Sequence, residues 1–146
     1  GRGTTRPFEL IGAPKISGRR MVEMLTKSGL RGVAFRPVAF KPLFQKHAGE
    51  KVEGVQLHVT DAREFFPYKT GVALLAALKK CAGDSFQWRN TPYEFVTDRP
   101  AIDLLTGSSQ VRQALEAEVP VGEIAAMWRE GEKDFAKRRK PYLRYE

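Results

Sequence analysis

Residues 54–61 read GVQLHVTD, the clearest strand pattern in the sequence. Apolar and polar side chains alternate along it. The apolar members are Val55, Leu57 and Val59, and the polar members are Gln56, His58 and Thr60. A period of two residues is typical of a β-strand with one buried face and one polar face. The stretch therefore predicts a strand with a histidine on its polar face.

A second extended pattern lies upstream, in GVAFRPVAFKP at residues 32–42. Its alternation is interrupted by Pro37 and then resumes in the same manner. Because proline cannot donate a hydrogen bond to a β-ladder, we expect a strand with a break or an edge position at Pro37. A shorter extended piece is expected at residues 8–11, inside a loop that covers residues 1–16. Residues 41–53 predict a polar loop.

Helical patterns surround these strands. The clearest is TGVALLAALKKCAGD at residues 70–84, which predicts a helix over 70–82 that ends at Gly83. Its expected apolar face consists of Val72, Leu75, Ala76 and Leu78. Ser17 is placed to cap a helix over 18–28, and Gly29 suits the position just past its end.

The second half of the chain predicts shorter elements. SFQWR at 85–89 and PYEFV at 92–96 predict two short strands, and Asp98 is expected to cap a short helix. Another helix is expected from Ser108 or Ser109 to Ala117. A last helix is expected over 122–139, with one apolar stripe formed by Ile124, Met127, Trp128, Gly131 and Phe135. Helices and strands mix without a regular βαβ repeat. We therefore expect an α+β fold, a small mixed or antiparallel sheet packed with several helices in a single domain.

The composition favours an anionic partner. Among 146 residues, 25 Lys and Arg face 17 Asp and Glu, which gives a formal net charge of +8. The densest basic block is KDFAKRRKPYLRY at 133–145. No apolar run approaches the roughly 20 residues that span a membrane. The single Cys81 forms no internal disulfide, and two histidines without ligand spacing predict no metal site. No phosphate-binding glycine motif is present, and no cofactor is expected.

The opening GRGTTRPFEL at 1–10 is the first candidate site. Arg2 and Arg6 flank Thr4 and Thr5, and two guanidinium groups with two hydroxyls suit a clamp for a carboxylate or phosphate. The alternative is a frayed terminus. The polar face of the 54–61 strand is the second candidate, where Gln56 and His58 either contact a ligand or support the fold. No carboxylate is singled out as catalytic.

The whole chain resembles the C-terminal part of a bacterial exo-β-N-acetylmuramidase family of peptidoglycan recycling, formerly a family of unknown function. The blocks that carry this resemblance, in the family's order and spacing, are GRGTTRPFELIGAP at 1–14, FRPVAFKPLFQKHAGE at 35–50, GVQLHVTD at 54–61, TGVALLAAL at 70–78, PYEF at 92–95, IDLLTGS at 102–108 and RRKPYLRY at 138–145. Lys41 stands where the family commonly has a small polar residue.

The resemblance implies that residues 1–146 are the C-terminal auxiliary domain of a two-domain protein. The absent N-terminal, Rossmann-like domain is then the partner that carries the catalytic glutamates. The expected function is a substrate-cleft domain of a glycoside hydrolase that releases terminal N-acetylmuramic acid, inactive alone and without catalytic residues of its own. The expected sugar contacts are Arg2, Thr4, Thr5, Arg6, Gln56 and His58. Wall-sugar chemistry suggests a periplasmic or secreted protein.

Two other classes of function stay open at this point. The first is a binding module for an anionic polymer, either cell-wall glycan or nucleic acid, driven by the net charge of +8. Nucleic acid is not the expected partner, because no known nucleic-acid-binding motif is present. The second is an interaction domain whose main task is packing on its partner domain, which an exposed apolar patch would favour.

Overall fold

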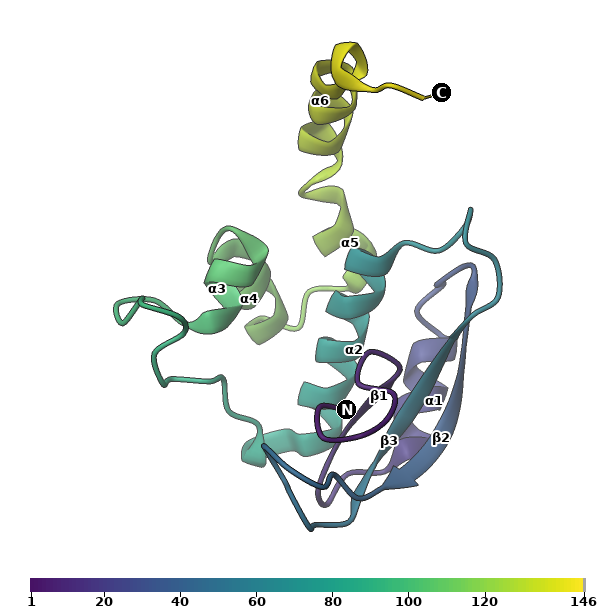
Figure 1. Ribbon diagram of the computed structural model, residues 1–146, viewed down its shortest axis with the longest axis vertical. Coiled ribbons are helices and arrows are strands. Elements are labelled where there is room, and N and C mark those ends of the chain that lie inside the picture. The colour runs from purple at the N-terminus through teal and green to yellow at the C-terminus, as the bar shows by residue number, and fades with distance from the viewer. Residues whose placement is uncertain (146) are drawn as a thin grey trace.

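The computed structural model describes residues 1–145 and shows a sheet, helices packed against it and an arm that projects from the body (Figure 1). In chain order the elements are β1 (Leu10–Ala13), α1 (Gly18–Thr26), β2 (Val33–Phe40), β3 (Val52–Val59), α2 (Pro67–Ala82), η1 (Gly83–Ser85), α3 (Ala101–Thr106), α4 (Gln110–Glu116), α5 (Val121–Ala126), α6 (Arg129–Arg139) and η2 (Lys140–Tyr142).

The sheet has three antiparallel strands in the order β1-β3-β2, which confirms the predicted α+β fold. The stretch that predicted the sheet forms β3 at its centre. Pro37 lies in the edge strand β2, opposite Val55, and β2 runs through it without a break. This confirms the predicted edge position of Pro37. Proline is tolerated there because the outer side of an edge strand needs no hydrogen-bond donor.

One face of the sheet is covered by α1 and α2. Met21 and Leu25 of α1, Val55 of β3 and Leu74 of α2 belong to one buried cluster, in which Met21 and Val55 are fully enclosed. The predicted cap of α1 is confirmed, since the Ser17 side chain accepts a hydrogen bond from the Arg20 backbone N–H at 3.3 Å. Gly29 follows the helix with a positive φ of 65°.

Helix α2 is buried on two sides rather than one. Ala73, Leu74 and Ala77 face the cluster at the sheet, whereas Val72 belongs to a second cluster with buried residues of α4 and α5. The predicted single face was therefore wrong in part: Val72 is buried, but Leu75, Ala76 and Leu78 are only half-buried. The reason is tertiary packing: α2 lies between the sheet layer and the C-terminal helices, so it is covered on two sides (Figure 1).

The segment before α3 corrects two predictions. The strands expected at 85–89 and 92–96 do not form; the structure has only an isolated bridge between Tyr93 and Val96 there. Instead, the Trp88 indole N–H donates to Glu116 at 2.9 Å, so a side chain anchors the segment. Asp98 does not cap α3, which follows Pro100 at its N-cap without a side-chain cap bond.

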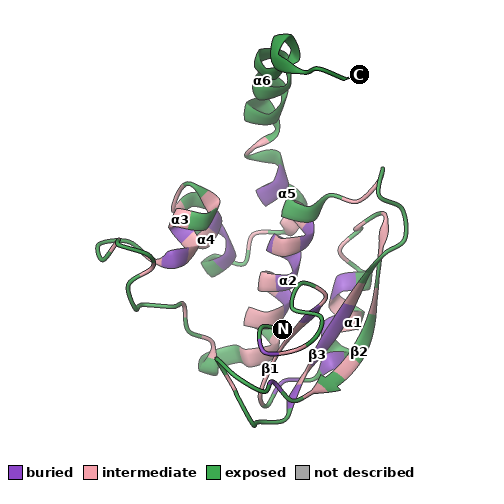
Figure 2. Ribbon diagram, viewed as in Figure 1, coloured by how far each residue is buried: buried purple, intermediate pink, exposed green. Residues whose placement is uncertain are grey.

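The last predicted helix is two helices. It divides at Met127–Trp128 into α5 and α6, because Trp128 turns back onto Tyr68 of α2, with ring centroids 4.6 Å apart. The expected apolar stripe does not reach the core beyond this point: Met127 and Phe135 are exposed, and α6 buries no residue. Figure 2 shows α6 exposed along its length. Within residues 1–145, no helix is both long enough and apolar enough to cross a membrane.

Candidate functional site

The candidate site lies on the outer face of the sheet, which we define as the face opposite α1. Val55 points into the core cluster, so its neighbour Gln56 points to the outer face. The strand register aligns Leu10 of β1, Gln56 of β3 and Arg36 of β2 in one row across the sheet. The loop of residues 1–9 precedes β1 and contacts this row through Glu9.

The 1–9 loop is a defined turn rather than an extended tail. The Thr4 hydroxyl donates to the Gly1 carbonyl at 2.6 Å and accepts from the Arg6 backbone N–H at 3.2 Å. Gly3 has a φ of 85°, and its carbonyl accepts a hydrogen bond from the Leu43 N–H at 2.9 Å. A Cβ at residue 3 would collide with the Phe44 carbonyl, so glycine permits both the backbone conformation and the close approach.

Four side chains form a polar network across this face. The Arg6 guanidinium donates through Nη1 to Glu9 Oε2 at 2.8 Å, and Gln56 Nε2 donates to the same oxygen at 3.0 Å. On the other side of Gln56, Arg36 Nε donates to Gln56 Oε1 at 2.9 Å, and Arg36 Nη2 donates to it as well. The order of the network is therefore Arg6, Glu9, Gln56 and Arg36.

The network is ionic and carries a positive surplus. The hydrogen bond from Arg6, followed by that from Gln56, holds the pKa of the Glu9 carboxyl below its ordinary value. The positive charge of Arg6 acts in the same direction. Glu9 is therefore ionised at neutral pH, and the two arginines outnumber it by one charge.

The six predicted site residues fall into two groups. Arg2, Thr5 and Arg6 are exposed on the loop, and the half-buried Thr4 uses its hydroxyl inside the turn. Gln56 is buried, with 3% of its surface exposed, whereas His58 is exposed near the end of β3. The structure thus brings Arg6 and Gln56 together through Glu9.

Glu9 and Arg36 are the members of the network that sequence reasoning missed. Glu9 follows Arg6 by three residues, a spacing that suits an ion pair within a turn, and this pattern could have indicated it. Arg36 becomes a neighbour of Gln56 only through the register of β2 and β3, which the sequence pattern does not specify.

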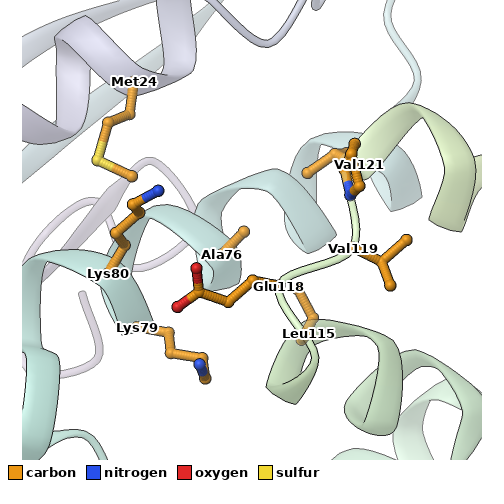
Figure 3. A pocket seen from close by; sticks show the side chains of 9 residues that line it. Met24, Ala76, Lys79, Lys80, Leu115, Glu118, Val119 and Val121 are labelled. Carbon is orange, nitrogen blue, oxygen red and sulfur yellow. The ribbon is translucent and has the colours of Figure 1, made fainter.

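A separate cavity of about 170 Å³ lies between α1, α2 and the α4–α5 connection. Figure 3 shows it; its lining is Met24, Ala76, Lys79, Lys80, Leu115, Glu118, Val119, Pro120 and Val121. None of the predicted site residues lines this cavity, and we assign it no role. Among the described residues, no group of three or more His, Cys, Asp or Glu side chains is arranged to hold a metal ion.

Comparison with known proteins gives matches along nearly the entire chain. The family model "Exo-beta-N-acetylmuramidase NamZ, C-terminal" matches residues 1–145. The chain is also similar to the peptidoglycan beta-N-acetylmuramidase NamZ of Bacillus subtilis strain 168, with 37% identity over 145 residues. This match covers 99% of the chain and 33% of the relative, so the chain spans about a third of that protein's length.

One solved structure has the same fold. The crystal structure of a DUF1343 family protein from Bacteroides fragilis NCTC 9343 superimposes with a TM-score of 0.77 at 22% sequence identity. The likeness covers 99% of this chain and 37% of that chain. The shared fold therefore includes the three-stranded sheet together with the C-terminal helices.

Proposed function

Because the chain belongs to the family of C-terminal domains of the exo-β-N-acetylmuramidase NamZ, we propose that it forms one wall of a substrate cleft in a peptidoglycan-recycling glycoside hydrolase. In this proposal the parent enzyme releases terminal N-acetylmuramic acid, and a preceding catalytic domain supplies the other wall. The main support for this proposal is the exposed pair of cations, Arg2 and Arg6, on a loop that is fixed to the sheet.

The chemistry of the sugar matches this loop. N-acetylmuramic acid differs from N-acetylglucosamine by a lactyl ether that ends in a carboxylate. Guanidinium groups bind carboxylates through charge-assisted hydrogen bonds, which are stronger than neutral ones. Arg2, Arg6 and the exposed Thr5 hydroxyl supply such donors, while Thr4 supports the turn. His58 lies near enough to affect Glu9 electrostatically and is the remaining candidate contact.

The surface around the loop supports a domain partner on this side. Phe8 of the loop is 92% exposed, and Leu43 and Phe44, in the segment that the Gly3 carbonyl binds, are also exposed. Large exposed apolar side chains are typical of a surface that another part of a protein covers. In our proposal, this part is the catalytic domain, and the wall sugar lies between it and the loop.

The domain is expected to be inactive by itself. Glycoside hydrolysis generally needs two carboxyl groups across the scissile bond, one of them with a raised pKa. Within the network described above, the carboxylate is Glu9, whose pKa is lowered and whose Oε2 accepts two hydrogen bonds. A chromogenic muramoside assay on the isolated domain and on the full-length parent tests this. We expect turnover by the parent only; turnover by the isolated domain would refute the auxiliary role.

The role of the arginines is tested in the full-length parent. Arg6→Ala and Arg2→Ala should each lower kcat/KM for a muramoside by about 10- to 100-fold, the effect of losing a hydrogen bond to a charged group. The uncharged N-acetylglucosaminide should be affected much less. Arg19→Ala is the matched control, because Arg19 is exposed on α1, behind the other face of the sheet. Equal losses on both sugars would refute the carboxylate role.

The C-terminal arm favours a second candidate function, binding of an anionic polymer. Helix α6 carries Lys137, Arg138 and Arg139 in its last turn and buries no residue. If the arm binds an anionic glycan, affinity for it should fall steeply with added salt, as it does for polyelectrolyte ligands. Binding that is independent of salt would exclude this candidate. Wall-sugar chemistry places either function outside the cytoplasmic membrane in our proposal.

A further inference from the structure

The polar network on the outer face contains a buried link between two charged groups. We infer that Glu9, Gln56 and Arg36 are positioning residues, which fix the Arg6 guanidinium for a ligand carboxylate. This inference rests on the proposed function, because it deepens the role given to Arg6 there. These three residues contact each other rather than the sugar.

Gln56 is held in one orientation. Its side chain is buried, and its two ends have different partners: Oε1 accepts from Arg36, and Nε2 donates to Glu9 at 3.0 Å. A flipped amide would place NH₂ against a guanidinium and a carbonyl oxygen against a carboxylate, which is unfavourable at both ends. Arg36 therefore fixes which atom of Gln56 faces Glu9.

Glu9 connects the fixed Gln56 amide to the Arg6 guanidinium. The same carboxylate oxygen, Oε2, accepts from Gln56 on the sheet and from Arg6 Nη1 on the loop at 2.8 Å. Without Gln56, the Glu9–Arg6 pair would be an exposed ion pair between neighbouring turn residues, and such pairs hold their geometry weakly. The buried amide connects that pair to the central strand of the sheet.

The network therefore holds the Arg6 guanidinium in place without using all of its hydrogen-bond donors. Arg6 uses one N–H donor of Nη1 on Glu9, and its side chain is still 58% exposed. A guanidinium that is already oriented loses less side-chain entropy when a ligand binds. Because the network contains two arginines and one ionised glutamate, its surplus of one positive charge suits a single carboxylate.

A double-mutant cycle in the full-length parent tests the inference. The quantity measured is a selectivity, kcat/KM for a chromogenic muramoside divided by kcat/KM for its lactyl carboxamide, which has the same shape without the charge. Gln56→Met removes both amide hydrogen bonds while leaving every network charge in place. We expect it to lower the selectivity about tenfold through misplacement of Arg6. In an Arg6→Ala background, Gln56→Met should cause no further loss.

Each outcome of the cycle decides something different. If Arg6→Ala leaves the selectivity unchanged, the proposed function itself fails. If Arg6→Ala lowers the selectivity and Gln56→Met does not, only the positioning role fails. If Gln56→Met lowers it by the same factor in both backgrounds, Gln56 acts independently of Arg6, and the inference is overturned.

A second variant covers the case in which Gln56→Met does not fold, as judged by its thermal unfolding. Glu9→Asp keeps the charge and shortens the side chain by one methylene, so the carboxylate no longer spans Gln56 and Arg6. It should lower the selectivity in the wild-type background and not in the Arg6→Ala background. Glu53→Asp is its control, because Glu53 pairs with Lys51 outside the network. An equal loss from Glu9→Asp in both backgrounds would overturn the inference.

Discussion

At the scale of single residues, Glu9 makes the stability of the domain depend on pH. Its pKa is lowered in the folded state, chiefly by the hydrogen bond from Arg6, from an ordinary value of 4.5. The unfolded chain therefore binds the proton first as the pH falls. The stabilisation from Glu9 is complete above the ordinary value and is lost as the pH falls through the lower, folded-state pKa.

This dependence predicts how Glu9→Gln behaves in thermal unfolding. At pH 7 the variant should have a lower Tm than the wild type, because it cannot form the ionic hydrogen bond to Arg6. As the pH falls below 4.5 the two Tm values should converge, since the wild-type carboxyl is progressively protonated. The other carboxylates are common to both proteins, so the difference isolates Glu9. A gap in Tm that is constant from pH 7 to pH 3 would contradict the assignment.

The candidate site was partly predictable at this scale. Arg2 and Arg6 could be selected because cations, hydroxyls and glycines cluster within six residues. Gln56 could be placed on a polar strand face from alternation alone. That Gln56 would be buried and bonded to Arg36 could not be predicted, because the contact joins residues 20 apart through the β2–β3 register.

At the scale of elements, a partly buried ion pair joins the two short helices α3 and α4. Arg112 of α4 donates to both carboxylate oxygens of the buried Asp103 of α3, at 2.8 and 3.0 Å. The hydrogen bonds that Arg112 donates to Asp103 and Glu116 raise the pKa of its guanidinium, so it stays charged. A neutral residue at 103 removes the buried partner of Arg112 and leaves this arginine only its 3.3 Å contacts with Glu116.

Asp103→Asn should therefore lower the Tm by several degrees and leave the sheet intact. Asp98→Asn is the matched control: Asp98 lies in the same region, is highly exposed and only pairs loosely with Arg99. It should change the Tm very little. Differential scanning fluorimetry of both variants measures the contrast. A larger effect of Asp98→Asn would favour the helix-capping role predicted from the sequence over the exposed position in the structure.

Elements with a strong local pattern could be predicted, and those that depend on distant contacts could not. The central strand, predicted at 54–61 and observed at Val52–Val59, follows from its period. The helix predicted at 70–82 follows from its period and from Gly83 at its end, although it begins three residues earlier, at Pro67. SFQWR has an equally strand-like composition, yet a strand needs a neighbour, and Trp88 instead bonds to Glu116 of α4. The division of the last helix at Met127–Trp128 likewise depends on Tyr68, far away in the chain.

At the scale of the whole molecule, α2 joins two hydrophobic clusters into one unit. One cluster contains the fully buried Met21 of α1, and the other the fully buried Ile124 of α5. Met21→Ala and Ile124→Ala should each reduce the free energy of unfolding by about 2–5 kcal/mol. Because both clusters share α2, chemical denaturation should stay a single transition in each variant.

The control for this prediction is Leu105→Ala, since Leu105 is mostly exposed on α3. It should change the free energy of unfolding by less than about 0.5 kcal/mol. If Ile124→Ala instead produced a second transition, with the sheet unfolding separately, the two clusters would be independent units. Circular dichroism and tryptophan fluorescence together distinguish these cases, because both tryptophans, Trp88 and Trp128, pack against the second cluster.

We propose above that the loop of residues 1–9 binds the carboxylate of a muramoyl sugar. A crystal structure of the full-length parent with N-acetylmuramic acid bound is its most direct measurement. We predict that the lactyl carboxylate lies within hydrogen-bonding distance of the Arg6 guanidinium, with Glu9 still bonded to Gln56. A sugar bound in a cleft that the 1–9 loop does not face would refute this role of the loop.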